Sequence, residues 1–196
     1  MKRIGIYSGT FDPVHAGHIG FALQAITEAK LDAVYFLPER RPRNKIGTEH
    51  FGHRVAMLKR ASRPHRKLHV LELEDVSFSV ATTLPRLQKR FPKAQLVFLA
   101  GSDIVAHVPQ WDNSEQLLRQ VEVVVGVRAA DTLAVIQESV GRWAVRPKAL
   151  FVFESAAPAV SSRKVREALR KRAHVPGLLR SVERYSNRNW LYISLA

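Results

Sequence analysis

The sequence predicts an α/β protein in which helices cover both faces of a doubly wound, mostly parallel sheet. Two observations carry this prediction. Short apolar runs of strand length alternate with segments of helical periodicity along almost the whole chain. The runs are also nearly continuous in apolar residues, as expected of parallel strands buried on both faces. With 196 residues and no internal repeat, we expect residues 1–196 to form one domain.

The first predicted unit is a strand, a helix and a second strand. Residues 3–8 form a short apolar run that ends in the turn-forming Gly-Thr-Phe-Asp-Pro at 9–13. Apolar residues then recur at helical spacing over 19–29, and the apolar run DAVYFLP occupies 32–38. The length of the unit suits a right-handed crossover between parallel strands.

The middle of the chain alternates less regularly. Residues 40–52 form a basic loop that is poor in apolar residues, and the helix that follows it ends before Pro64. We expect a third strand over 69–73. A helical pattern covers 79–91, although Pro85 lies awkwardly inside it.

The second half continues the alternation. The buried strand QLVFLA at 95–100 stops at Gly-Ser-Asp. A helix that contains Leu117 and Leu118 leads to further strands over 121–127 and 149–153.

The C-terminal region is basic. Six lysines and arginines lie between residues 163 and 172, on a predicted helix. The tail over 175–196 contains Trp190, Leu191 and Tyr192, apolar groups that indicate docking. We therefore expect residues 162–196 to form a basic helical C-terminal segment packed on the domain.

The chain is strongly basic. It has 31 Lys and Arg against 17 Asp and Glu, a net charge of +14 and a pI near 10.7. A positive field attracts nucleotides, nucleic acids and anionic membranes, and a solvated basic surface explains the charge without any partner. The absence of cysteine excludes disulfides, thiolate metal sites and cysteine nucleophiles. No apolar stretch has the length of a signal peptide or a membrane span, so we expect a cytoplasmic protein without a membrane partner.

The clearest chemistry lies in GTFDPVHAGH, residues 9–18. This segment follows the first strand, where helix N-termini of parallel sheets receive phosphates, and Gly9 and Gly17 leave room near the backbone. It is neither a Walker A loop nor a G-x-G-x-x-G motif. His15 and His18, three residues apart, share a helix face. They fit three roles: metal ligands, caps of the turn, or hydrogen-bond donors to phosphoryl oxygens.

Four segments of the chain resemble one enzyme family. GTFDPVHAGH matches a T/H-x-G-H signature, and Gly101-Ser102-Asp103 followed by Trp111 is similar to a G-x-D…W segment. VSSRKVR at 160–166 is similar to I-S-S-T-x-I-R, and the tail over 175–192 resembles L-V-P…V…Y-I…L-Y. In this order, the segments resemble the nicotinate-nucleotide adenylyltransferase family of the nucleotidyltransferase superfamily. The resemblance implies a Rossmann-like fold.

The resemblance also implies a reaction of NAD biosynthesis. AMP would pass from ATP to the phosphate of nicotinate mononucleotide, giving the deamido dinucleotide and pyrophosphate, with Mg²⁺ accompanying ATP. The mononucleotide phosphate is itself the nucleophile, so no covalent enzyme intermediate is implied. Catalysis would consist of positioning and charge neutralisation.

Site roles follow from the same resemblance. The implied ATP-binding residues are Ser8, Gly9, Thr10, Phe11, His15, His18, Gly101, Asp103, Ser161, Ser162 and Arg166. The implied catalytic residues are His15, His18, Lys45 and Arg166, and the implied acceptor-binding residues are Lys45, Thr82 and Trp111. By residue type alone, a lysine on a loop is normally a solvated charge and a tryptophan is most often a core side chain, while Asp103 also fits a helix N-cap.

Three departures from the family concern the site. The family's S-Y-T-x-D-T appears as SFSVAT at 77–82, without the tyrosine and the aspartate, and Thr83 fits the register almost as well. The loop 41–45 lacks the family's P-P-H-K, and Arg163 replaces a threonine. Nicotinamide mononucleotide and phosphopantetheine therefore stay open as alternative acceptors.

An alternative of another class is a basic nucleic-acid-binding module that keeps the fold without catalysis. The chain has no RRM or KH signature, so we do not expect a nucleic-acid partner. The sequence is compatible with a homo-oligomer and does not report which mononucleotide is preferred.

Overall fold

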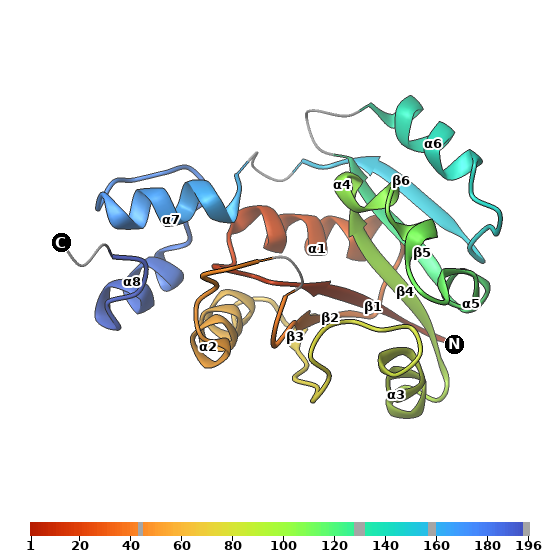
Figure 1. Cartoon of the computed structure of the whole chain (residues 1–196), viewed down its shortest axis with the longest axis horizontal. Coiled ribbons are helices and arrows are strands. Elements are labelled where there is room, and N and C mark those ends of the chain that lie inside the picture. The colour runs from red at the N-terminus through yellow and green to blue at the C-terminus, as the bar shows by residue number, and fades with distance from the viewer. Residues whose placement is uncertain (43–44, 128–131, 157–159, 194–196) are drawn as a thin grey trace.

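The computed structural model describes residues 1–42, 45–127, 132–156 and 160–193. Its centre is a six-stranded sheet in the order β3-β2-β1-β4-β5-β6 (Figure 1). All five strand pairs are parallel, so the predicted α/β class is confirmed and the sheet is more uniform than predicted. The strands are β1 (Lys2–Gly9), β2 (Ala33–Pro38), β3 (Leu68–Val70), β4 (Ala94–Gly101), β5 (Glu122–Val127) and β6 (Leu150–Glu154).

Helices cover both faces of this sheet. Buried side chains of α1, α2, α7 and α8 share one apolar cluster with the sheet, and those of α3, α4, α5 and α6 share a second. Doubly wound sheets have this arrangement. The helices are α1 (Ala16–Glu28), α2 (Phe51–Ser62), α3 (Thr83–Arg90), α4 (Ser102–Val105), α5 (Ser114–Gln120), α6 (Leu133–Gly141), α7 (Ser162–Arg170) and α8 (Arg180–Arg188), with a 3-10 turn at Val108–Gln110.

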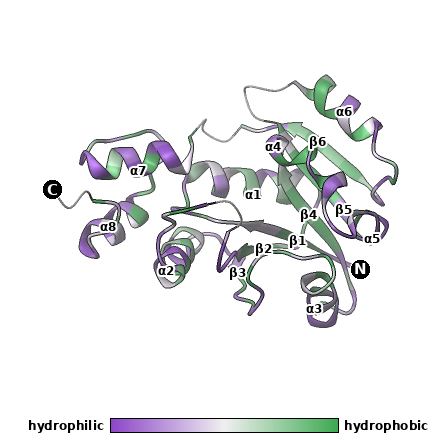
Figure 2. Cartoon of the chain, viewed as in Figure 1, coloured by the Kyte–Doolittle hydropathy of each residue, from purple (hydrophilic) through white to green (hydrophobic). Residues whose placement is uncertain are grey.

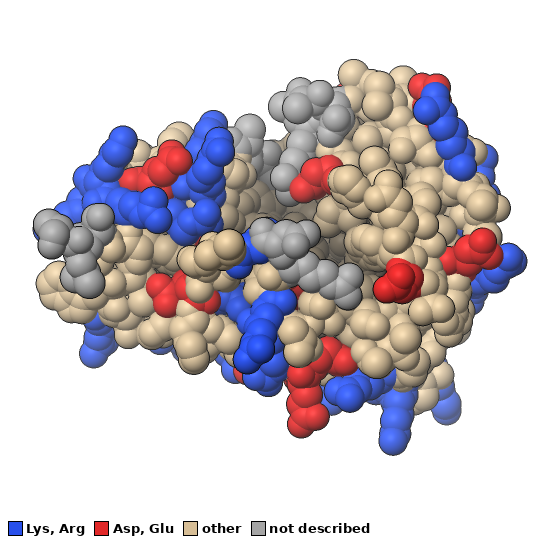
Figure 3. All heavy atoms as spheres, in the orientation of Figure 1, with Lys and Arg blue, Asp and Glu red and all other residues tan. Residues whose placement is uncertain are grey.

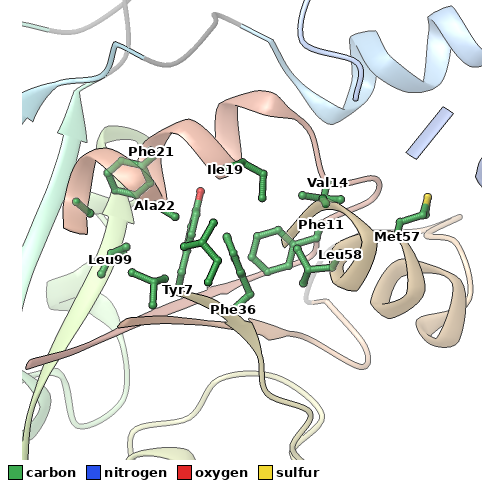
Figure 4. Packing of buried hydrophobic residues seen from close by; sticks show 14 of the residues in the cluster. Tyr7, Phe11, Val14, Ile19, Phe21, Ala22, Phe36, Met57, Leu58 and Leu99 are labelled. Carbon is green, nitrogen blue, oxygen red and sulfur yellow. The ribbon is translucent and has the colours of Figure 1, made fainter. Parts of the chain in front are cut away.

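The strands supply side chains to both clusters in alternation. On β4, Val97 and Leu99 belong to the first cluster, whereas Phe98 belongs to the second. The strands are accordingly among the most hydrophobic parts of the chain in Figure 2. Figure 4 shows the first cluster, in which Tyr7 and Phe36 of the strands meet side chains of α1 and α2.

Two element boundaries differ from the prediction. The helix predicted over 79–91 begins at Thr83, so its first four residues were wrongly assigned. Pro85 consequently lies in the first turn, where the missing N–H costs no helical hydrogen bond. The strand predicted over 69–73 covers only Leu68–Val70. The helices α4 and α6 were not predicted.

The last helix, α8, lies beside α2. The Tyr185 hydroxyl of α8 is 3.0 Å from His53 Nδ1 of α2. Leu191 is buried in the first cluster, whereas the Trp190 side chain is 69% exposed. Lysine and arginine side chains gather over α7 in Figure 3. Among the described residues, no helix is both long enough and apolar enough to cross a bilayer.

Candidate active site

The loop between β1 and α1 lies where the strand order reverses. Strands β2 and β3 extend from one side of β1, and β4, β5 and β6 extend from the other. In such sheets, ligands bind outside the carboxyl ends of the strands at this point. The Phe11 backbone has a positive φ of 50°, and its buried ring packs edge-on against Tyr7 and Phe36. Phe11 therefore fixes the loop from the core side.

A buried arginine of α2 holds the same loop. The Arg54 side chain is 1% exposed, and its guanidinium donates hydrogen bonds of 2.6 to 3.1 Å to four carbonyl oxygens, those of Thr10, Glu39, Arg40 and Glu49. Burial lowers the pKa of Arg54, and the negative charge of Asp12 opposes that shift. Arg54 thus ties the residue after β1 to the chain that leaves β2.

Arg54 is not among the predicted site residues. A signal for it exists, because Arg54 precedes Leu58 and Ala61 at helical spacing and so lies on the apolar face of α2. A charged residue on a buried face needs partners, and here they are loop carbonyl groups.

Asp12 connects the loop to the C-terminal segment. Its carboxylate is buried, and Oδ1 accepts hydrogen bonds from the Tyr192 hydroxyl at 2.7 Å and the Glu49 N–H at 3.3 Å. Oδ2 lies 3.6 Å from the Arg166 guanidinium, which also donates to the Asp12 carbonyl oxygen. Burial raises the pKa of Tyr192 far above its usual range, and the Asp12 charge raises it further. Asp12 and Tyr192 were not among the predicted site residues.

The two histidines of the motif stack on each other at the start of α1. Their ring centroids are 3.7 Å apart, and the His15 backbone N–H donates to His18 Nδ1 at 3.2 Å. His15 is the N-cap residue, so the structural role left open by the sequence is present. Because Nδ1 of His18 accepts that bond, the neutral ring carries its proton on Nε2. His18 therefore keeps an N–H donor at this end of the sheet. Among the described residues, no group of three or more His, Asp or Glu could hold a metal ion.

A pocket of about 260 Å³ opens beside the carboxyl end of β1. Ser8, Gly9 and Thr10 are among the residues that line it. The Ser8 hydroxyl is buried and has no hydrogen-bond partner in the described part of the chain. Lys45 also lines the pocket, and its Nζ donates to Thr10 Oγ1 at 2.8 Å.

Part of the pocket wall is aromatic. Trp111 stands edge-on to Phe98 with ring centroids 5.7 Å apart, and Phe78 lies 5.2 Å from Phe98 and 6.2 Å from Trp111. All three rings line the pocket. A flat heteroaromatic group can stack on such a wall, while the polar side holds its anionic substituents.

The predicted acceptor residues fall in two places. Lys45 and Trp111 line the pocket, but Thr82 does not line it: its exposed hydroxyl donates to Asp75 Oδ1 at 3.0 Å. Phe78 and Ser79 line it instead. Thr83, the other register considered, is buried in the first turn of α3. Residues 78–80 are therefore the part of this segment that faces the pocket.

The remaining predicted residues lie at helix starts. Ser161 caps α7 by accepting from the Lys164 N–H, and the Ser162 hydroxyl donates to the Pro13 carbonyl oxygen at 3.0 Å. The N-terminus of α7 thus adjoins the β1–α1 loop. Asp103 is exposed in α4, and the N-cap of that helix is Gly101, so Asp103 is not the cap.

The chain is similar in sequence to a family model and to curated proteins. A family model described as cytidylyltransferase-like matches residues 6–168. The "Nicotinate-nucleotide adenylyltransferase" of Bacillus subtilis (strain 168) is 38% identical over 130 residues, which cover 63% of this chain and 68% of that protein. The "Probable nicotinate-nucleotide adenylyltransferase" of Bacillus pumilus is 31% identical, with 99% of this chain and 100% of that protein covered.

The fold has solved counterparts. The structure titled "Plasmodium falciparum nicotinic acid mononucleotide adenylyltransferase complexed with NaAD" matches with a TM-score of 0.82 at 19% identity, and all of both chains is covered. At this identity, the match concerns the fold. The six-stranded parallel sheet and its flanking helices therefore have an experimentally determined equivalent.

Proposed function

The chain belongs to the nicotinate-nucleotide adenylyltransferase family, and from this premise we propose that it transfers AMP from ATP to the phosphate of nicotinate mononucleotide. The products are the deamido dinucleotide and pyrophosphate. One observation supports this proposal for the chain. A pocket with an aromatic wall adjoins the β1–α1 loop, which lies where the strand order of the sheet reverses. The two halves fit a pyridine mononucleotide and the phosphates of ATP.

ATP is assigned to the loop and the two helix starts beside it. The Nε2–H of His18 donates to the α-phosphoryl group as negative charge builds on it, and the N-terminus of α7 at Ser161 and Ser162 faces the distal phosphates. Arg166 contributes a fork of N–H donors once phosphate replaces Asp12 as its partner. The positive ends of α1 and α7 add to this field.

The mononucleotide is assigned to the pocket. Its pyridine ring stacks on Trp111 and Phe78, and Lys45 supplies a polar contact. The Lys45 ammonium group donates a hydrogen bond to the Thr10 hydroxyl, where the pocket meets the loop. It is therefore suited to contact the phosphate that joins the two nucleotides.

The reaction is an in-line displacement. An oxygen of the mononucleotide phosphate forms a bond to the α-phosphorus of ATP, and the bond from that phosphorus to the bridging oxygen breaks. Pyrophosphate leaves with the electron pair of the broken bond. Mg²⁺ enters this scheme on the ATP phosphates, as part of the substrate. The protein supplies donors and orientation and forms no covalent bond.

Turnover with each acceptor tests the proposal. Purified protein is given Mg-ATP with nicotinate mononucleotide, nicotinamide mononucleotide or phosphopantetheine, and the adenylylated product and pyrophosphate are quantified. We expect the deamido dinucleotide to form fastest. Product from phosphopantetheine alone, or no dinucleotide from either mononucleotide, would contradict the proposal. The cytoplasmic location and the homo-oligomer stay predictions from the sequence.

His18→Ala tests the role of the donor. Losing one preorganised donor to a transition-state charge lowers kcat by about 100- to 1000-fold. His69→Ala, at an exposed histidine of β3, is the matched control and keeps wild-type turnover. Full activity of His18→Ala would remove His18 from the mechanism.

A further inference from the structure

The C-terminal segment returns to the phosphate-binding loop through a single side chain. The Tyr192 hydroxyl donates to Asp12 Oδ1 at 2.7 Å, across 180 residues of sequence. The end of the segment is anchored independently: the Leu191 N–H donates to the Ser186 carbonyl oxygen at 3.0 Å, and the Ser186 hydroxyl donates to the Leu191 carbonyl oxygen at 3.2 Å. The path of the chain therefore does not depend on the Tyr192 hydroxyl.

The Asp12 carboxylate is divided between two groups of partners. Tyr192 and the Glu49 N–H occupy Oδ1, whereas Arg166 lies 3.6 Å from Oδ2, longer than a close charge-assisted hydrogen bond. A carboxylate held by neutral donors on one oxygen competes less strongly for a cation on the other. The Arg166 side chain is 28% exposed, so it can reach a ligand as well as Asp12.

We infer that Tyr192 is a positioning residue for ATP, acting through Asp12 on Arg166. Its hydroxyl holds the carboxylate in place, so that Arg166 can exchange its Asp12 contact for the phosphates of ATP. Without the hydroxyl, Oδ1 loses its shortest partner, and the carboxylate turns toward Arg166 and competes with the nucleotide. The inference rests on the proposed function, because it takes ATP as the ligand of this loop.

Two observations support this role over a purely structural one. The ring of Tyr192 packs at the edge of the first apolar cluster, so phenylalanine would preserve the packing and remove only the hydrogen bond. The carboxylate that receives the bond is buried, and the charged side chains near it include Arg54, Arg166 and Glu49. In low-dielectric surroundings, a small rotation of a carboxylate changes its attraction to a neighbouring cation substantially.

The test compares two tyrosines of the same segment. Tyr192→Phe and Tyr185→Phe each remove one hydroxyl hydrogen bond, but the partner of Tyr185 is His53, outside the loop. We expect Tyr192→Phe to raise KM and Kd for ATP about three- to ten-fold, the range of one weakened contact to a charged group. In Tyr192→Phe, KM for the mononucleotide stays unchanged. In Tyr185→Phe, KM and Kd for ATP stay at the wild-type values, although Tm changes about as much as in Tyr192→Phe.

A double-mutant cycle tests the route through Asp12. If Tyr192 acts through this carboxylate, Tyr192→Phe has no further effect on ATP affinity in an Asp12→Asn background. Additive effects would overturn the inference. So would an unchanged Kd for ATP in Tyr192→Phe, or an equal rise in Tyr185→Phe.

The two proposals fail separately. ATP affinity is measured by titration with ATP alone, so it does not depend on turnover. A wild-type protein that binds ATP but adenylylates neither mononucleotide contradicts the proposed function only. A wild-type protein that makes the dinucleotide, together with a Tyr192→Phe variant of unchanged ATP affinity, contradicts this inference only.

Discussion

Arg54 is the side chain on which the β1–α1 loop depends most. It satisfies four carbonyl oxygens with one guanidinium and lies near the buried Asp12 carboxylate. These carbonyl groups belong to residues outside the helices and strands. Arg54 therefore satisfies backbone carbonyl groups that, in a sheet, would bond to a neighbouring strand.

Replacing Arg54 by methionine tests this dependence. We expect the free energy of unfolding to fall by about 3 to 5 kcal/mol, because buried carbonyl groups and the Asp12 charge lose their partner. Urea denaturation measures the change. Lys59→Met on the same helix removes an exposed ion pair with Glu72 and costs less than about 1 kcal/mol. An equal fall in the free energy of unfolding of the two variants would show that Arg54 stabilises the protein no more than an exposed ion pair does.

The candidate site residues were easier to find in the sequence than the residues that hold the β1–α1 loop in place. His15, His18 and Lys45 stand out by type and spacing, and Trp111 stands out by its place after a strand. Asp12 and Arg54 act through side chains far apart in sequence, which periodicity does not reveal. Phe78 was noted only as a missing tyrosine, yet its ring forms part of the pocket wall.

At the scale of elements, Gly126 of β5 leaves room for the Phe21 ring of α1. A Cβ added at Gly126 of β5 would fall 2.5 Å from Cε2 of Phe21. The Phe21 ring is held between Tyr7 and Phe153, with centroid distances of 5.3 and 5.9 Å, so it has little freedom to move aside. The glycine therefore allows this ring of α1 to pack directly against the backbone of β5.

Gly126→Ala tests this contact. Overpacking the interface should lower the free energy of unfolding by about 1 to 3 kcal/mol, measured by thermal or urea denaturation. Gly141→Ala is the matched control, because nothing lies within 4 Å of its added Cβ at the end of α6. The control should be neutral or slightly stabilising. A neutral Gly126→Ala would mean that the ring relaxes freely.

Elements with strong periodicity were predicted well, and short or weakly patterned ones were not. The predicted strands 95–100 and 121–127 lie within one residue of β4 and β5 at each end. By contrast, α4 has only four residues, and in α6 only Ile136 and Val140 are buried. One buried residue per turn leaves too faint a pattern in the sequence.

At the scale of the whole molecule, charge is unevenly distributed. Residues 160–193 contain nine lysines and arginines against two acidic residues, half of the net charge of +14. Arg170, Lys171 and Arg172 are exposed, and within the described residues none of them forms an ion pair. Both proposed substrates are anions, so this surface raises their concentration near the site.

Salt should weaken this effect. We expect kcat/KM for ATP to fall by about three- to ten-fold between about 50 and 500 mM NaCl, as screening shortens the reach of the surface field. Replacing Arg170, Lys171 and Arg172 by glutamine should flatten that dependence. The same change at Lys89, Arg90 and Lys93, near α3 at the other end of the molecule (Figure 1), should not. If the salt dependence of kcat/KM flattened equally in the two variants, the total charge of the protein, and not the position of these residues, would explain the effect.

The three tryptophans occupy three different surroundings, which gives the protein a built-in optical probe. Trp111 lines the pocket, Trp143 is 6% exposed in the second cluster and Trp190 is 69% exposed. An aqueous quencher such as iodide therefore reaches Trp190 first, and Trp190→Phe removes that background emission. The fluorescence that remains reports on the pocket, because a pyridine ring stacked on Trp111 changes its intensity while Trp143 stays constant.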